Sequence, residues 1–157
     1  RAGVECLMVS ADDQDTVTGA RGMEVTMDEK LSEIDDQCDL VVLPGGIPGV
    51  PNLKANSKVQ AMVKAQNDRG GYVAAICAGP TALGAFGVLA DKNATCYPGC
   101  EDQLMAKRHS TEPVVVDGNV ITSRGVGTAI EFALKLVEIL IDRQTADDLA
   151  EKIVYKR

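Results

Sequence analysis

The sequence predicts an α/β fold in which a mostly parallel, doubly wound sheet is covered by helices on both faces. Two short and almost continuous apolar runs, Leu40–Leu43 and Tyr72–Ile76, are typical of strands that are buried on both faces. Residues 57–69, between the two runs, and residues 128–141, after the second run, have the apolar spacing of helices. Strands that alternate with helices in this way are typical of a parallel sheet.

Before the first buried strand, the chain is predicted to form two further strands joined by a loop. Residues 4–9 are mostly apolar and predict a strand. Residues 12–20 are polar and contain glycine, which predicts a loop, and Glu24–Thr26 predicts a short strand. The run Leu40–Leu43 stops at Pro-Gly-Gly, residues 44–46, so we expect a buried parallel strand that ends in a tight loop.

The middle of the chain predicts a helix, a strand and a second helix. The first helix covers residues 57–69 and is closed by two glycines. The buried strand Tyr72–Ile76 follows, and residues 78–89 are predicted to be helical. Pro80 is compatible with this helix because it falls in the first turn, where a backbone N–H has no partner within the helix.

The last third predicts a hairpin and two helices. Residues 95–97 predict a short strand, and residues 114–122 predict a hairpin that turns at Asp-Gly. Residues 128–141 predict a strongly amphipathic helix, and residues 146–154 predict a weaker one.

Composition indicates one globular domain over residues 1–157. The net charge of −7 argues against nucleic acid or an anionic membrane surface as a partner. Aromatic residues make up 3% and Trp is absent, which argues against stacking of bases or sugars. No apolar run reaches the roughly 20 residues of a membrane span. Five irregularly spaced cysteines argue against a disulfide framework and favour a reducing compartment.

The beginning of the sequence resembles the end of a helix. Arg1, Ala2 and Gly3 are typical of a last helical turn with glycine as its cap, directly before a strand. We therefore expect an intact chain to begin with one further strand and that helix. The alternative is a short leader introduced for expression.

One segment carries the candidate chemistry. Cys77 lies at the junction of a predicted buried strand and a helix, with small residues on both sides, as in a nucleophile elbow. The positive end of the following helix favours the thiolate form. The alternative is that Cys77 is a small buried apolar residue, as most cysteines are. The neighbouring motifs favour the reactive thiol.

Two glycine-rich turns accompany this cysteine. Gly45 and Gly46 follow a strand at its carboxyl end, where ligands bind in open parallel sheets, and their N–H groups can approach an oxyanion together with that of Ala78. The alternative is an ordinary loop. The turn over residues 123–128 lacks the spacing of a phosphate-binding loop, and we interpret it as a wall of the pocket.

These motifs resemble the ThiJ/PfpI superfamily, in the branch of the human Parkinson-disease protein deglycase. The resemblance spans nearly the whole chain and implies a flavodoxin-like fold and a homodimer. Its motifs are Val-Val-Leu-Pro-Gly-Gly at 41–46, Ala-Ala-Ile-Cys-Ala-Gly-Pro-Thr-Ala-Leu at 74–83, and Thr-Ser-Arg-Gly-Val-Gly-Thr at 122–128, followed by Glu-Phe-Ala-Leu at 131–134.

The resemblance implies roles for particular residues. Cys77 corresponds to the catalytic, oxidation-sensitive cysteine, with the N–H groups of Gly45, Gly46 and Ala78 around it. Arg21 corresponds to an arginine that reaches the active-site region of a neighbouring subunit. The implied activities are glyoxalase chemistry without glutathione, deglycation of early methylglyoxal adducts and protection against oxidative stress.

The sequence departs from the family pattern in three places. The family's active-site Glu belongs to a strand–helix unit before the Arg-Ala-Gly segment, so we expect either a separate N-terminal fragment as a partner or an incomplete polypeptide. His109, the single histidine, lies near the family's catalytic His but with a shorter spacing to Arg124, so it is either catalytic or a bystander. Val126 replaces a common Pro in the pocket turn.

The remaining cysteines favour no metal site. Cys6 and Cys38 lie in or beside apolar runs and are predicted to pack. Cys96 and Cys100 could bind a metal with His109, but no fourth ligand stands out, so no metal and no cofactor is expected. A better interpretation makes one of these two the resolving partner of oxidised Cys77.

We therefore predict a cysteine-dependent, glutathione-independent glyoxalase or deglycase, a hydrolase or lyase acting on a small dicarbonyl or its glycated adducts. The alternative is a redox-sensing chaperone that uses oxidation of Cys77. A glutamine amidotransferase would need a downstream His-x-Glu, and a family protease would carry His in place of Ala78. The expected compartment is the cytoplasm, with the nucleus and mitochondrion as alternatives.

Overall fold

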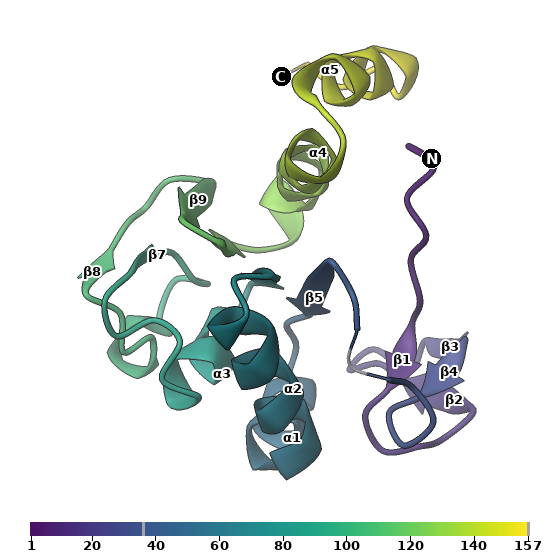
Figure 1. Cartoon of the computed structure of the whole chain (residues 1–157), viewed down its shortest axis with the longest axis vertical. Helices are drawn as coiled ribbons and strands as arrows, with labels where there is room; N and C mark the ends of the chain where they lie inside the picture. The colour runs from purple at the N-terminus through teal and green to yellow at the C-terminus, as the bar shows by residue number, and fades with distance from the viewer. Residues whose placement is uncertain (36, 157) are drawn as a thin grey trace.

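The core of the protein is a four-stranded sheet with the order β5-β6-β10-β9 (Figure 1). The computed structural model describes residues 1–35 and 37–156. Strands β5 (Leu40–Leu43), β6 (Tyr72–Ile76) and β10 (Val120–Ser123) run parallel, and β9 (Val114–Asp117) pairs antiparallel with β10. The predicted mostly parallel sheet and the predicted hairpin are therefore both confirmed.

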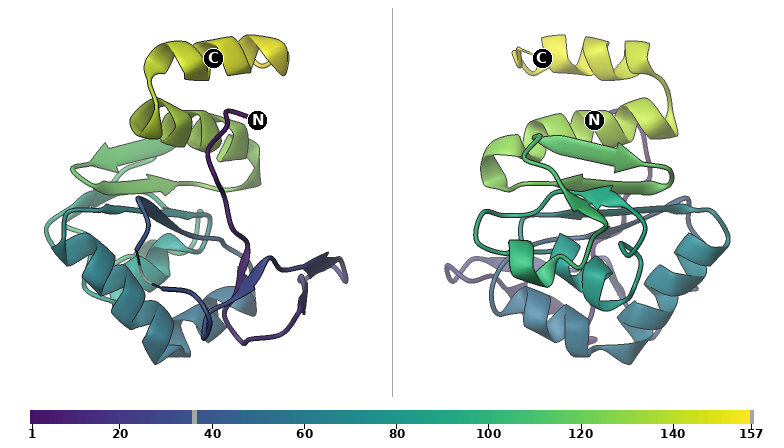
Figure 2. Two further views of the ribbon diagram at one scale, coloured as in Figure 1. Left: turned by 45° about the vertical axis from the view of Figure 1, so that its right-hand side comes forward. Right: turned by 90° about the vertical axis from the view of Figure 1, so that its left-hand side faces the viewer.

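Helices cover both faces of this sheet, as predicted (Figures 1 and 2). Helices α1 (Gly49–Ala55), α2 (Ser57–Asp68) and α3 (Pro80–Ala85) lie on one face. Helix α4 (Ala129–Leu140) lies on the other face, and α5 (Arg143–Lys152) packs on the outer side of α4. Among the described residues, no helix combines the length and apolar character needed to cross a bilayer.

Successive side chains of β6 point to opposite faces of the sheet and therefore belong to two different apolar clusters. Val73 and Ala75 are fully buried in the larger cluster, which includes residues of α1, α2 and α3. Ala74, between them, packs with Ile121 and Phe132 in the smaller cluster under α4. A strand that is apolar at every position is thus explained by burial on both sides.

Short elements complete the chain around this core. The described residues contain three further pairs of short strands: β1 (Val9–Ser10) with β4 (Glu29–Lys30), β2 (Thr16–Thr18) with β3 (Glu24–Thr26), and β7 (Asn93–Ala94) with β8 (Arg108–His109). They also contain two 3₁₀ turns, η1 (Glu101–Gln103) and η2 (Val126–Thr128). The pairs β1–β4 and β7–β8 are parallel, and β2–β3 is an antiparallel hairpin.

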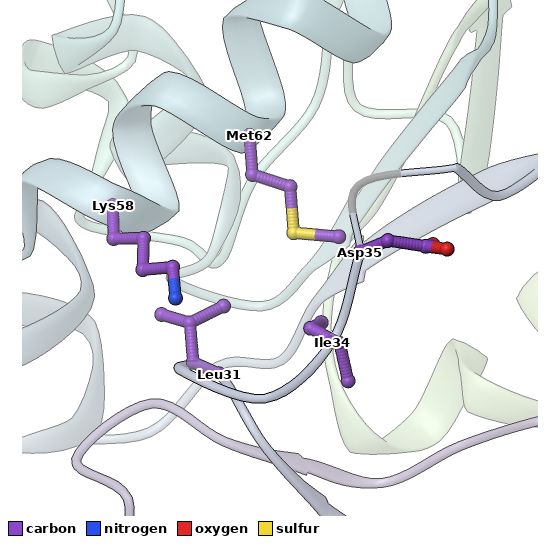
Figure 3. A pocket seen from close by; sticks show the side chains of 5 residues that line it. All are labelled: Leu31, Ile34, Asp35, Lys58 and Met62. Atoms are coloured by element: carbon purple, nitrogen blue, oxygen red, sulfur yellow. The ribbon is translucent and has the colours of Figure 1, made fainter.

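A cavity of about 190 Å³ lies between the loop after β4 and helix α2 (Figure 3). Its lining combines apolar side chains with one lysine and one aspartate. The lining residues are Leu31, Ile34, Asp35, Lys58 and Met62. None of them belongs to the motifs that carry the candidate chemistry.

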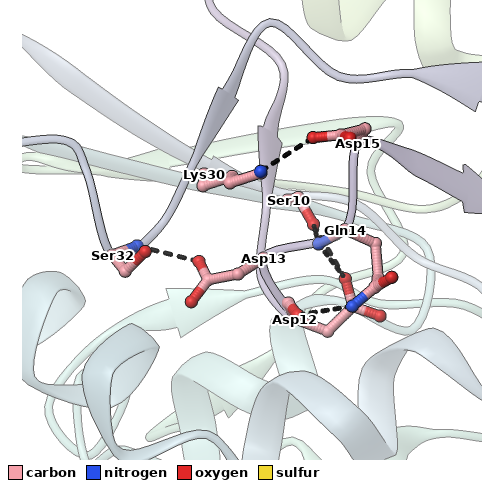
Figure 4. Close-up of polar contacts among 7 residues, drawn as sticks. All are labelled: Ser10, Asp12, Asp13, Gln14, Asp15, Lys30 and Ser32. Carbon is pink, nitrogen blue, oxygen red and sulfur yellow. Dashed lines mark hydrogen bonds and ion pairs between the residues drawn. The ribbon is translucent and has the colours of Figure 1, made fainter.

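An ion pair and several hydrogen bonds stabilise the segment that links β1 to β4 (Figure 4). The Lys30 ammonium lies 2.8 Å from a carboxylate oxygen of Asp15, and the Ser32 N–H donates to Asp13 over 2.9 Å. The Ser10 hydroxyl accepts from the Gln14 N–H at 2.9 Å. These contacts hold a loop that has few apolar residues to bury.

Two predictions for the N-terminal third are wrong. The strand predicted over residues 4–9 is reduced to Val9–Ser10, because β4 offers only two residues for pairing and residues 4–8 form no ladder. The loop predicted over residues 12–20 contains strand β2, whose partner β3 holds it through a short hairpin.

Helix boundaries also differ from prediction in the middle of the chain. Helix α1 was not expected, because its Pro-Gly-Val-Pro start resembles a loop, although Pro51 falls in the first turn where proline is tolerated. The helix predicted over residues 78–89 is only Pro80–Ala85, since Gly87 with φ +81° ends it. The strand predicted at 95–97 lies at Asn93–Ala94 instead.

Candidate active site

Cys77 occupies a sharp turn between β6 and α3. Its φ is 66°, in the left-handed region that residues other than glycine rarely adopt. The Cys77 N–H donates to the Ser123 carbonyl over 3.0 Å, and the Cys77 carbonyl accepts from the Tyr97 N–H over 2.8 Å. These two hydrogen bonds hold the strained backbone from both sides, which leaves the side chain half-buried.

The loop after β5 approaches this turn so closely that glycine is required. A Cβ at Gly45 would lie 2.5 Å from the Cβ and 3.1 Å from the Sγ of Cys77. A Cβ at Gly79 would lie 2.7 Å from the Leu43 carbonyl oxygen and 2.9 Å from that of Ile76. The structure thus brings together Gly45 and Cys77, which are more than thirty positions apart in the sequence.

The predicted oxyanion donors lie in these same two segments. Gly46 has a φ of +97° and Ala78 is 8% exposed. Within residues 1–35 and 37–156, the N–H groups of Gly45, Gly46 and Ala78 donate to no protein acceptor. Donors that are free of internal partners are available to an oxygen of a bound substrate.

The glycine-rich turn at 123–128 borders the site, as the sequence predicts. Ser123 is adjacent to Cys77 through the backbone hydrogen bond described above, and its hydroxyl bonds to Thr128 at 2.7 Å. A Cβ at Gly125 would lie 3.3 Å from the Tyr97 ring. Val126 is 92% exposed, so the side chain that replaces the family's proline points to solvent.

His109 is exposed on β8, next to Ala94 of β7. The hydrogen bonds from the Glu101 and Gly99 N–H groups, with a smaller contribution from His109, lower the pKa of the Glu101 carboxyl. In the described part of the chain, no hydrogen bond joins His109 to Cys77. Its catalytic role stays a prediction.

Arg21 is exposed at the tip of the β2–β3 hairpin. The Gly19 N–H donates to Met23 and the Gly22 N–H donates to Gly19, which closes the hairpin. This hairpin projects from the body of the molecule, on the side away from α3 (Figures 1 and 2). Within one chain, the structure does not bring Arg21 to Cys77.

The other four cysteines have different environments. Cys6 and Cys38 are exposed, so the prediction that they pack in the interior is wrong. Cys96 is buried, and burial raises the pKa of its thiol to about 11. Cys100 is half-buried; burial, and next the nearby Cys77 thiolate, raise the pKa of its thiol. No cluster of His, Cys, Asp or Glu among the described residues could hold a metal ion.

Two backbone hydrogen bonds that support the cysteine were not predicted from the sequence. Tyr97 donates its N–H to Cys77, and Ser123 accepts from Cys77. Ser123 could have been found, because parallel pairing of β6 with β10 places it opposite Ile76. Tyr97 lies in a loop, and no sequence pattern links that loop to the strand end.

Comparison with known families and curated proteins shows a consistent likeness. Residues 1–139 match the DJ-1/PfpI family. The chain is 39% identical to the Parkinson disease protein 7 homolog of Danio rerio, covering 99% of this chain and 85% of that protein. It is 33% identical to the glutathione-independent glyoxalase DJR-1.2 of Caenorhabditis elegans, covering 98% of this chain and 82% of that protein.

Solved structures show the same likeness in three dimensions. The Drosophila melanogaster DJ-1beta structure superimposes with a TM-score of 0.94 at 36% identity, covering 99% of this chain and 86% of that one. The oxidized DJ-1 of Toxoplasma gondii gives a TM-score of 0.94 at 34% identity, with 99% and 86% coverage.

Proposed function

The chain belongs to the DJ-1/PfpI family, and from this premise we propose that it is a glutathione-independent glyoxalase and protein deglycase with Cys77 as its nucleophile. The observation that carries the proposal is the backbone of Cys77 at the β6–α3 turn, which has a left-handed conformation and lies in close contact with Gly45. Holding a cysteine in this conformation costs about 1–3 kcal/mol, which is typical of strain retained at a functional site. The relative named a glutathione-independent glyoxalase supports the chemistry.

The proposed reaction is an internal redistribution within methylglyoxal that needs no external oxidant. The Cys77 thiolate attacks the aldehyde carbon, and the oxyanion formed accepts hydrogen bonds from the Gly45, Gly46 and Ala78 N–H groups. A proton then moves from the former aldehyde carbon to the neighbouring carbon, which converts the hemithioacetal into a thioester. Water hydrolyses the thioester, releasing lactate and the Cys77 thiol.

The deglycase reaction follows the same path from an adduct. In an early methylglyoxal adduct, the former aldehyde carbon carries the amine or thiol; the Cys77 sulfur bonds to this carbon, the bond to the amine or thiol breaks, and that group leaves with a proton. The hemithioacetal formed on Cys77 then rearranges to the thioester as above, and water hydrolyses it. We propose His109 as a proton carrier in these steps, because imidazole exchanges protons near neutral pH.

Turnover of methylglyoxal without glutathione tests the assignment. Cys77→Ser should reduce kcat/KM by about 1000-fold or more, because a serine hydroxyl is a much weaker acid than a thiol and almost none of it is ionised near neutral pH. Cys38→Ser is the matched control, since Cys38 is also partly accessible but lies outside the site. Equal loss in both variants, or full activity in Cys77→Ser, would contradict the proposal. His109→Gln tests the proton carrier separately, through the pH profile of kcat.

A redox-sensing chaperone is the second candidate. It is favoured by the half-buried, accessible position of Cys77 and by the similarity to a solved DJ-1 that is described as oxidized. Suppression of client aggregation, measured before and after peroxide treatment, separates the two functions. A chaperone of this kind gains activity on oxidation, and Cys77→Ser loses that gain. A glyoxalase loses turnover under the same treatment.

We also propose a homodimer of this chain with a small dicarbonyl as its substrate, located in the cytoplasm or in another reducing compartment such as the nucleus or mitochondrion. Five free cysteines support a reducing environment. The projecting hairpin that carries Arg21 supports contact with a second subunit. Light scattering at micromolar concentration should give twice the chain mass of 16.6 kDa.

A further inference from the structure

We propose that Cys100 is a resolving cysteine for Cys77, so that a hydroperoxide converts the pair into a reversible intramolecular disulfide. The inference rests on the proposed function only in taking Cys77 as the reactive thiol. It adds a second residue and a second reaction to the site.

The loop that carries Cys100 is tied to the Cys77 turn by its backbone. The Tyr97 N–H donates to the Cys77 carbonyl over 2.8 Å, and the Cys100 N–H donates to the Tyr97 carbonyl over 3.0 Å. The second hydrogen bond closes a four-residue turn, so Cys100 folds back toward Tyr97 rather than extending away. Two consecutive hydrogen bonds therefore connect the segments of the two cysteines.

The side chains also share one environment. Cys100 packs at the edge of the apolar cluster that contains Ala78, the residue after Cys77. Burial raises the pKa of the Cys100 thiol most, and negative charge on the Cys77 sulfur raises it next, so the two thiols lie within electrostatic reach of each other. Both side chains are half-buried, so each keeps some access to solvent.

The remaining cysteines are less suited to this role. Cys96 is nearer to Tyr97 in sequence but is fully buried, and its pKa of about 11 leaves almost no thiolate at neutral pH. Cys38 lies beside Gln66 of helix α2. Cys6 lies in the exposed N-terminal segment. Only Cys100 combines partial exposure with electrostatic proximity to Cys77.

The chemistry balances in two steps. The Cys77 thiolate attacks the distal oxygen of a hydroperoxide, the O–O bond breaks, and hydroxide or alkoxide leaves, giving a sulfenic acid. The Cys100 thiolate then attacks the Cys77 sulfur, the S–O bond breaks, and hydroxide leaves to form water. Overall, two thiols are oxidised to one disulfide and the hydroperoxide is reduced to water and water or alcohol.

The turn between the two cysteines can adjust for bond formation, because Pro98 and Gly99 are exposed and Gly99 has a φ of +92°.

The disulfide has a functional consequence. A sulfenic acid that is not resolved proceeds to sulfinate, which thiols do not reduce. Capture by Cys100 therefore keeps the inactivation of Cys77 reversible.

Peroxide titration of the full chain, followed by non-reducing peptide mass mapping, tests the inference. The wild type should give a Cys77–Cys100 cross-link that dithiothreitol removes. Cys100→Ser and Cys100→Ala should instead accumulate Cys77 sulfinate about tenfold faster. Cys38→Ser should behave like the wild type, and circular dichroism checks that each variant is folded.

Each other outcome overturns the inference. Equal rates of sulfinate formation in the wild type and Cys100→Ser, or a cross-link from Cys77 to a different cysteine, would show that Cys100 does not resolve. If Cys77 stays reduced while another cysteine oxidises first, the reactive-thiol assignment itself fails, and the proposed function fails with it. If Cys77 is oxidised normally without a cross-link, only the inference fails.

Discussion

Backbone conformation at single residues carries most of the information about this site. The position of Cys77 at a sharp strand-to-helix turn could be predicted, because it falls between an apolar strand pattern and a helical pattern. Gly45 could be placed near it, because the carboxyl ends of parallel strands share one edge. The support from Tyr97 could not be predicted, since it is a backbone hydrogen bond between distant loops. The packing of Cys6 was mispredicted because an apolar neighbourhood in sequence does not guarantee a partner in space.

Gly45→Ala should impair the site more than the fold. The added methyl would lie 2.5 Å from the Cβ of Cys77, so one of the two segments must shift. Overpacking of this kind costs about 1–3 kcal/mol in unfolding free energy, and displacement of the donors should lower methylglyoxal turnover further. Gly49→Ala is the matched control, because a Cβ there meets nothing within 4 Å. Equal turnover in the two variants would contradict the close contact.

Cys77→Gly and Cys77→Ala should differ in stability although both remove the thiol. With φ at 66°, alanine retains the strain and glycine releases it. The glycine variant should therefore be more stable to urea by about 1 kcal/mol. A glycine variant less stable than the alanine variant would show that the turn is not strained at this residue.

At the scale of elements, apolar sequence patterns predicted helices and strands best in the part of the sheet that helices cover on both faces. Strands β5 and β6 and helix α4 have the predicted positions because their burial is decided by their own composition. Strand β1 was predicted too long because a strand also needs a neighbour, and β4 pairs with only two of its residues. Pairing of this kind depends on distant residues, which a local pattern does not contain.

The β1–β4 segment should loosen in acid. The Ser32 N–H lowers the pKa of the Asp13 carboxyl below its usual 3.8, so this contact stabilises the fold above that value and is lost as pH falls through the lower, folded pKa. The Lys30 contact lowers the pKa of Asp15 in the same direction. Hydrogen exchange at the Ser32 amide, followed from about pH 5 to 2, should show protection falling with acid. In the Asp13→Asn variant, the protection of the Ser32 amide should no longer fall with acid through titration of residue 13. If its pH profile is the same as that of the wild type, the Asp13 carboxyl is not responsible.

At the scale of the whole molecule, the two faces of the sheet bury apolar clusters of different size. The face under α1, α2 and α3 holds the larger buried cluster, whereas the α4 face holds a small one. The two solved DJ-1 structures superimpose on this chain with a TM-score of 0.94 each, so the sheet arrangement is shared with these relatives. Sequence patterns give the helices on each face, but they do not show how one subunit meets another.

Mixing of inactive variants tests whether Arg21 acts across a dimer. Arg21 is exposed on a projecting hairpin, so Arg21→Ala should change stability little while lowering turnover. A dimer of Arg21→Ala with Cys77→Ser would contain one site with an intact Cys77 and an intact Arg21 from the other subunit. Refolding the two variants together should therefore give more methylglyoxal turnover than the sum of the two alone. A strictly additive result would place Arg21 outside the site of its partner.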